Sequence, residues 1–168
     1  IEIKRPQDAI KHGIAYLTED RKAQGLFLDM GLSDNFIAPI LKMFTGKAGF
    51  LNFEEVETHA VTQIKNYNIA TPSTKQKVMN LSGGNQQKSM IAMWMGSQPQ
   101  VVIFDEPTRG VDVGARFEIY QKLRELTSEG VGILLISSEL PELIGLCDRI
   151  LVMHQGRITG EVQQKDFT

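Results

Sequence analysis

The chain has 168 residues, a formal net charge of −2 and 42% hydrophobic residues. This length and composition predict one globular domain with a hydrophobic core and exclude a mainly disordered chain. Lysine and arginine are spread along the chain rather than clustered, so we expect no nucleic-acid partner. Cys147 is the single cysteine, which rules out an internal disulfide and favours a reducing compartment.

The first predicted element is a buried strand. Residues 13–18 (GIAYLT) form a compact apolar run of the length that strands usually have. A short helix is predicted next, over residues 35–41, because Ser33 or Asp34 can accept hydrogen bonds from the free backbone N–H groups at its start.

A longer helix is predicted after Asn52, which is a good N-cap residue. Apolar residues recur there at spacings of three and four, and this places them on one face of a helix. A polar, proline-containing loop over 71–80 separates this helix from another, predicted over 85–96. The apolar face would consist of Phe53, Val56, Ala60, Ile64 and Tyr67.

From residue 100 onward, apolar runs alternate with helical patterns. A continuous apolar run suits a parallel strand that is covered on both faces, and the alternation predicts an α/β sheet flanked by helices. We therefore expect an α/β core from residues 1–30 and 98–168, with residues 31–97 forming a helical lobe. The elements expected in the second half are strands at 100–104 and 131–137, helices at 114–129 (Phe117, Tyr120 and Leu123 inward, Gly130 ending it) and 139–146, and a hairpin of 150–154 with 157–161.

A serine and two glycines, Ser82, Gly83 and Gly84, stand at the start of the predicted 85–96 helix. Backbone N–H groups left bare at the positive end of a helix dipole form an anion site, and the Ser82 hydroxyl adds a donor. Ser-Gly-Gly is also a common loop before a helix, and by itself this motif favours the plain loop.

Two carboxylates, Asp105 and Glu106, follow the apolar run Val101–Phe104. A buried parallel strand delivers its carboxyl end to the edge of the sheet, where such folds bind ligands. Asp105 there can hold Mg²⁺, and Glu106 can polarise the water that attacks a γ-phosphate. The alternative, a strand that ends in a solvated acidic turn, loses weight because the pair follows LSGG by about 20 residues and continues as PTRGVD.

The segments LSGGNQQK (81–88) and VVIFDEPTRGVDVGAR (101–116) resemble the signature motif, Walker B strand and D-loop of ATP-binding cassette (ABC) ATPases. Residues 16–22 are similar to the Q-loop, and residues 137–142 to the H-loop, of the second cassette in the tandem ATPase subunits of bacterial monosaccharide importers. The likeness covers essentially the whole chain, with five motifs in order.

This resemblance implies a partial ABC-type nucleotide-binding domain that uses ATP and Mg²⁺ at the cytoplasmic face of the bacterial inner membrane. The partners it implies are the N-terminal cassette of the same subunit, the transmembrane permease subunits and, indirectly, a periplasmic sugar-binding protein. Two rivals remain: a soluble cassette acting in translation or DNA repair, and a regulatory cassette that binds nucleotide without being an enzyme.

The sequence departs from a working ATPase in three places. It contains no Gly-x-x-x-x-Gly-Lys-Ser/Thr phosphate loop, which the family carries upstream of its Q-loop, so we expect the missing part to precede Ile1 and the 168 residues alone to be inactive. The catalytic positions of the Q-loop and H-loop hold Glu19 instead of glutamine and Ser138 instead of histidine. Because of these two residues, we expect this cassette's own site to be catalytically weak. Without the strand and helix around the phosphate loop, we also expect apolar sheet surface to be exposed and to promote self-association.

The signature motif, by contrast, is intact. In this family two cassettes pack head to tail, and the signature of one faces the ATP held by the other. The resemblance therefore assigns contact with the partner's nucleotide to Ser82, Gly83, Gly84, Asn85 and Gln86. Asp112 in the D-loop would bridge across the two cassettes, although it could equally be the cap of the helix that follows it.

Overall fold

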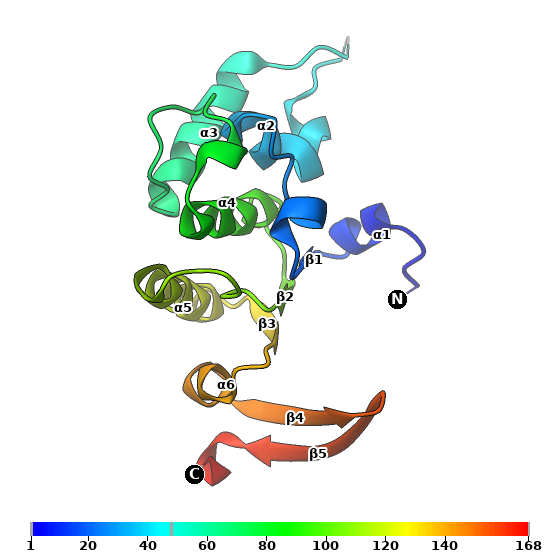
Figure 1. Cartoon of the computed structure of the whole chain (residues 1–168). Coiled ribbons are helices and arrows are strands. Elements are labelled where there is room, and N and C mark those ends of the chain that lie inside the picture. Colours follow the sequence, from blue (N-terminus) through cyan, green and yellow to red (C-terminus); the bar gives the residue numbers. More distant parts are fainter. Residues whose placement is uncertain (1, 48, 168) are drawn as a thin grey trace.

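The computed structural model describes residues 2–47 and 49–167. Figure 1 shows three parts: a helical lobe at the top, a parallel sheet in the middle and an antiparallel hairpin at the bottom. Among the described residues the sheet has the strand order β1-β2-β3, and β4 pairs with β5 alone. The strands are β1 (Ile14–Leu17), β2 (Val101–Asp105), β3 (Gly132–Ile136), β4 (Arg149–His154) and β5 (Arg157–Gln163).

The predicted helices lie close to their expected positions, whereas α1 was not predicted from the sequence. The short lobe helix differs, because it begins after Gly31 rather than after Ser33 or Asp34. The Asp34 carboxylate instead accepts a hydrogen bond from the Gly31 N–H at 3.3 Å, as the third helical residue of a capping box does. The α-helices are α1 (Pro6–Lys11), α2 (Leu32–Ile37), α3 (Phe53–Asn66), α4 (Gly83–Met95), α5 (Val113–Ser128) and α6 (Leu140–Leu146); a 3₁₀ segment (Ala38–Phe44) follows α2, and a π-turn (Arg21–Gly25) follows β1.

The parallel sheet confirms the predicted α/β core, but it is covered on one face only. Pairing in register places Leu17, Phe104 and Leu135 side by side on the covered face. On the opposite face Tyr16 and Leu134 are 47% and 48% exposed. The prediction that both faces of β2 are covered is therefore wrong for the described residues, and the apolar sheet surface is exposed as expected.

Two predicted inward positions are also exposed. Phe53 and Phe117 have exposed fractions of 76% and 62%. On α5 the buried positions are Ile119, Leu123 and Leu126, at the i, i+4, i+7 spacing of one helical face. Phe117 lies two residues, or more than half a turn, before this stripe, so it faces away from it.

Helix α4 joins the lobe to the sheet. Its residues Met90 and Ile91 are buried in the same hydrophobic cluster as Phe36 of the lobe and Val102 of β2. This continuous cluster means that the lobe and the sheet share one core. The division of the chain at residues 30/31 and 97/98 stays a prediction.

The start of α4 lies unusually close to the start of α5. A Cβ atom added to Gly84 would lie 2.6 Å from the Cβ of Ala115, a distance that real Cβ atoms essentially never show. Glycine at position 84 is therefore required for this approach, which brings the signature motif beside the D-loop.

Among the described residues, no helix is both long and apolar enough to cross a membrane.

We expect Gly84→Ala to lower the free energy of unfolding by up to about 2 kcal/mol. Overpacking costs about 1–3 kcal/mol, and the better helix propensity of alanine offsets about 1 kcal/mol of it. Gly145→Ala in α6 is the matched control, because no described atom lies within 4 Å of an added Cβ there. It should be neutral or slightly stabilising in urea denaturation, and equal losses in both variants would contradict the close-packing argument.

Candidate functional site

Strand β2 delivers Asp105 to the open face of the sheet. The Asp105 carboxylate accepts a hydrogen bond of 2.8 Å from the Tyr16 hydroxyl of β1. This hydrogen bond, with smaller contributions from burial and from the negative charge of Asp105, raises the pKa of the Tyr16 phenol. The phenol is thus held protonated, as a donor to a carboxylate at the edge of the sheet.

Glu106 connects the end of β2 to the turn that follows β3. Its N–H donates to the Ile136 carbonyl at 2.9 Å, and its carboxylate accepts a hydrogen bond of 2.7 Å from the Ser138 N–H. Its φ of +47° is rare for a residue with a side chain. The structure therefore brings Glu106 and Ser138 together and keeps Ser138 exposed.

Two further contacts, which sequence reasoning missed, hold the Ser138 turn in place. Arg116 of α5 donates to both carboxylate oxygens of Glu139, at 2.8 and 2.9 Å. The buried hydroxyl of Thr108 donates to the buried carboxylate of Glu142 at 3.0 Å. The partners in these pairs lie 23 and 34 residues apart, so no local pattern could have revealed them.

The residues at this edge fit a magnesium ion that is held mainly by other ligands. Asp105 supplies one carboxylate, and within residues 2–47 and 49–167 no three His, Cys, Asp or Glu side chains are grouped closely enough to hold a metal ion. Mg²⁺ is typically bound through one or two carboxylates, with phosphate and water oxygens filling its remaining positions. Asp105 is therefore suited to a nucleotide-bound Mg²⁺ rather than to a metal site made of protein alone.

Glu19 lies after β1 and forms an ion pair with Arg109, which follows Glu106 in the chain. No hydrogen bond or ion pair in the described part of the chain joins Glu19 to Asp105 or Glu106. The side chain predicted to act in catalysis is therefore engaged with the D-loop. Sequence reasoning missed Arg109, and its positive charge between Thr108 and Gly110 was the available signal.

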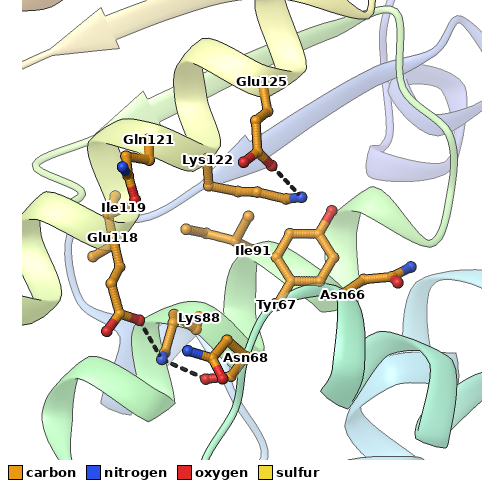
Figure 2. Close-up of a pocket in the computed structure, with 10 residues that line it drawn as sticks. All are labelled: Asn66, Tyr67, Asn68, Lys88, Ile91, Glu118, Ile119, Gln121, Lys122 and Glu125. Carbon is orange, nitrogen blue, oxygen red and sulfur yellow. Dashed lines mark hydrogen bonds and ion pairs between the residues drawn. The ribbon is translucent and has the colours of Figure 1, made fainter.

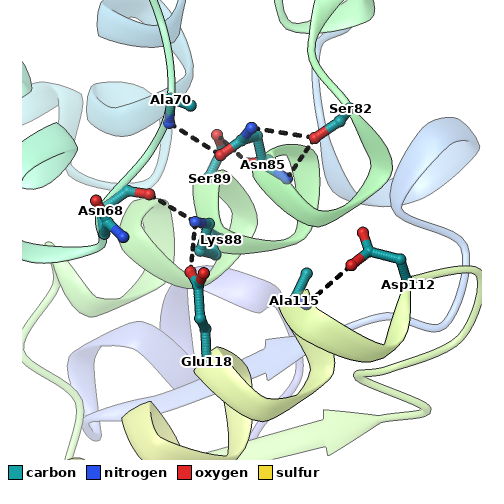
Figure 3. A network of polar contacts seen from close by, with 9 residues as sticks. All are labelled: Asn68, Ala70, Ser82, Asn85, Lys88, Ser89, Asp112, Ala115 and Glu118. Carbon is teal, nitrogen blue, oxygen red and sulfur yellow. Dashed lines mark hydrogen bonds and ion pairs between the residues drawn. The ribbon is translucent and has the colours of Figure 1, made fainter.

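The signature motif forms the N-terminus of α4, shown in Figure 3. Ser82 is the N-cap, and its hydroxyl oxygen accepts hydrogen bonds from the Asn85 side-chain amide at 3.0 Å and from the Asn85 N–H at 3.4 Å. The side-chain oxygen of Asn85, Oδ1, in turn accepts a hydrogen bond from the Ala70 N–H at 2.9 Å. Ser82 remains exposed, so its hydroxyl hydrogen is free to donate outward.

The remaining signature residues differ in accessibility. Gln86 is buried, and its amide donates to the backbone carbonyls of Val78 and Leu81 at 3.2 and 3.3 Å. This orientation fixes the loop before α4 and does not support contact with a nucleotide. Asp112 is the N-cap of α5, where it accepts a hydrogen bond of 3.0 Å from the Ala115 N–H, so the alternative interpretation as a helix cap is confirmed.

A pocket of about 150 Å³, shown in Figure 2, lies between the end of α3, α4 and α5. Lys88 donates there to the Asn68 carbonyl at 2.5 Å and to Glu118 at 2.8 Å. Lys122 pairs with Glu125 and lies 4.7 Å from the centre of the Tyr67 ring. Since both lysines are paired within the chain, we interpret this region as a joint between lobe and core rather than as a nucleotide site.

A family model described as "ABC transporter" matches residues 2–109, which is more than half of the chain. The chain belongs to the ABC transporter family. It is 52% identical over 161 residues to the xylose import ATP-binding protein XylG of Thermoanaerobacter pseudethanolicus, covering 96% of this chain and 32% of that protein. It is 48% identical over 166 residues to the ribose import ATP-binding protein RbsA of Bacillus subtilis, covering 99% and 34%. The chain thus spans about a third of the length of these curated relatives.

Solved cassettes share the fold. The chain superposes on the ADP- and phosphate-bound dimeric cassette MJ0796 with a TM-score of 0.79 at 19% identity, covering 99% of this chain and 70% of that one. For the ADP-bound cassette MJ1267 the TM-score is 0.76 at 23% identity, covering 97% and 66%. These comparisons confirm the ABC cassette fold and show that about a third of each solved cassette has no counterpart in the 168 residues.

We expect Glu106→Ala to speed hydrogen exchange of the Ser138 amide about tenfold or more. A hydrogen bond to a charged acceptor contributes about 1.5–3 kcal/mol, and its loss frees this turn. Glu106→Gln is the matched control, since its side-chain carbonyl can still accept the bond. Exchange rates from two-dimensional NMR test this, and equal rates in both variants would mean that the contact does not hold the turn.

Proposed function

We propose that this chain is the larger part of the second nucleotide-binding cassette in the ATP-binding subunit of a monosaccharide importer. Its main contribution to ATP hydrolysis is the signature motif, which it supplies to a site whose phosphate loop belongs to a partner cassette. The observation that carries this proposal is an exposed Ser82 that caps the start of α4 and whose oxygen is fixed by Asn85. The names of the xylose and ribose relatives support the substrate class.

The start of α4 has the properties of a γ-phosphate cap. Helix α4 has 13 residues, so its dipole places partial positive charge at Ser82 and Gly83. Asn85 fixes the Ser82 oxygen through two hydrogen bonds, which leaves the hydroxyl hydrogen to donate to an anion. We propose that Ser82, Gly83, Gly84 and Asn85 form this cap and that Gln86 supports it from within the core.

The cassette's own chemistry is proposed to be weak. The Glu19 carboxylate is paired with Arg109, and it cannot donate a hydrogen bond to phosphate as glutamine can. Ser138 lacks the reach and the positive charge of an imidazole. The loss of one donor to a transition state typically costs about 100- to 1000-fold in rate. With a nucleotide present, Asp105 would hold the Mg²⁺, an ion that neutralises phosphate charge, and Glu106 would orient the attacking water.

The proposed partners correspond to exposed apolar surfaces. The permease subunits would bind the lobe and the segment around Glu19, where several large apolar side chains are exposed: Phe27, Met30, Leu41, Met43, Phe50 and Phe53. The rest of the cassette would cover the open face of the parallel sheet. The importer would hold the chain at the cytoplasmic face of the bacterial inner membrane and receive its sugar from a periplasmic binding protein.

A regulatory cassette that binds nucleotide without supporting hydrolysis is the second candidate. The observation that favours it is the combination of a Glu19 engaged by Arg109 with a serine at position 138. Such a module would show no dependence of the hydrolysis rate on Ser82 or Glu106, which separates it from the proposed function.

We expect Ser82→Glu to abolish hydrolysis when this chain is assembled with its partner cassette, and to leave ATP binding by the partner in place. The added carboxylate would meet the γ-phosphate with like charge and remove the hydroxyl donor. Ser128→Glu, at the exposed end of α5, is the matched control and should hydrolyse ATP at the unaltered rate. Phosphate release and filter binding measure the two quantities, and full hydrolysis by the Ser82 variant would refute the proposal.

We expect no detectable binding when the 168-residue chain alone is titrated with MgATP in a calorimeter. The backbone cradle and lysine that hold the β- and γ-phosphates in this family are absent from its sequence. Addition of the partner cassette should restore binding. Tight binding by the chain alone would mean that it holds the phosphates in another way, and the division of roles proposed above would be wrong.

A further inference from the structure

The guanidinium of Arg21 joins the π-turn after β1 to the D-loop. Its Nη1 donates to the Arg109 carbonyl at 2.8 Å, and its Nη2 donates to the Gly110 carbonyl at 3.3 Å. The turn that carries Arg21 is itself fixed, because the Asp20 carboxylate accepts hydrogen bonds from the backbone N–H groups of Lys22 and Ala23 at 3.1 and 3.0 Å. Arg21 therefore projects from a capped turn onto the backbone of a second loop.

The same guanidinium lies against the signature motif. A Cβ atom added to Gly83 would lie 3.0 Å from Arg21 Nη2 and 3.0 Å from the Gly110 carbonyl oxygen. Gly110 has a φ of +65°, a conformation that glycine adopts without strain. Three loops thus meet at Arg21, and two of them provide glycines where it approaches.

A second contact joins the same two loops. Glu19, two residues before Arg21, pairs with the side chain of Arg109, whereas Arg21 holds the carbonyl of that residue. These residues surround a pocket of about 320 Å³ that is lined by Glu19, Asp20, Arg21, Lys22, Arg109 and Gly110. The Q-loop segment therefore contacts the D-loop in two ways. Arg21 binds the D-loop backbone, and Glu19 binds the Arg109 side chain.

The Arg21 side chain is half-buried, so the part of its guanidinium that is shielded from water depends on hydrogen-bond partners within the chain. Burial lowers the pKa of its guanidinium, which nevertheless stays charged because arginine is too basic to lose its proton in a protein. A buried charge is costly unless it is hydrogen-bonded, and its Nε has no partner among the described residues. The bonds from Nη1 and Nη2 offset this cost only while the D-loop stays where it is, so the position of one loop depends on the other.

We propose that Arg21 is a positioning residue that fixes the D-loop and the signature motif to the Q-loop segment as one unit. This inference rests on the proposed function, in which Ser82 faces a nucleotide held by the partner cassette. A displacement of the Q-loop segment then moves Ser82 and the D-loop together relative to that nucleotide. Arg21 acts through these groups and does not touch the nucleotide.

The test compares Arg21→Ala with Arg124→Ala in this chain assembled with its partner cassette. Arg124 is a matched control, because its guanidinium also donates to a backbone carbonyl, that of Gly145 at 2.9 Å, but outside the motif loops. We expect Arg21→Ala to lower kcat about tenfold and to leave the KM for ATP within about twofold, because ATP is bound by the partner. Arg124→Ala should lower the Tm by about as much as Arg21→Ala does, because each variant loses hydrogen bonds to backbone carbonyls. Unlike Arg21→Ala, it should leave kcat unchanged.

Two further readouts keep the test decisive if Arg21→Ala folds poorly. Arg21→Lys keeps the charge but loses the planar fork, so it should recover only part of kcat. Hydrogen exchange of residues 107–112 should be faster in both Arg21 variants than in Arg124→Ala.

Unchanged kcat in the Arg21 variants, or full recovery with lysine, would overturn the inference. If Ser82→Glu abolishes hydrolysis in the same assay while Arg21→Ala does not, the inference alone fails. If Ser82→Glu also leaves hydrolysis intact, the proposed function fails with it.

Discussion

The positions of the candidate catalytic residues depend on the parallel pairing of β2 with β1 and β3. Val102 and Phe104 of β2 are fully buried, and each such side chain contributes about 1.5–3 kcal/mol by leaving water. Because the three strands run in the same direction, their carboxyl ends meet at one edge of the sheet. Glu19, Glu106 and Ser138 follow these three ends, so a single hydrophobic constraint places three segments of distant sequence together.

Helix α4 connects this edge to the lobe. Its middle is buried in the shared core, and its first turn approaches α5 so closely that only glycine fits at position 84. The packing of one helix thus determines both how the lobe sits on the sheet and where Ser82 is presented. This close packing requires a residue without a side chain at position 84, at the start of α4.

Contacts between loops hold the edge of the site in place. The turn at Ser138 is held by Glu106, and the D-loop is held by Arg21 and Glu19, through contacts that join loops rather than regular elements. The ion pair between Glu19 and Arg109 is exposed, and exposed pairs contribute little to stability. Its value is geometric, since it directs a carboxylate toward the D-loop at the position where the family's Q-loop glutamine is expected.

Local chemistry was readable from the sequence. The strands, the N-cap Asn52, the terminating Gly130 and the motif loops depend on residues within a few positions of each other. The family could be recognised from the residues of the motifs and from their order along the chain, without coordinates. Contacts between segments were not readable, because side-chain spacing along one element says nothing about which other element faces it.

The sequence by itself therefore determined most of the element order, the ABC family, and the presence of an LSGG signature beside Glu19 and Ser138 at the Q-loop and H-loop positions. The tertiary structure alone decided that Glu19 pairs with Arg109, that Gln86 is buried, that Phe117 faces outward and that one face of the sheet is open. The physical reason is the range of the interactions. Caps, turns and strand propensity act over a few residues, whereas ion pairs and core packing depend on how the whole chain closes on itself.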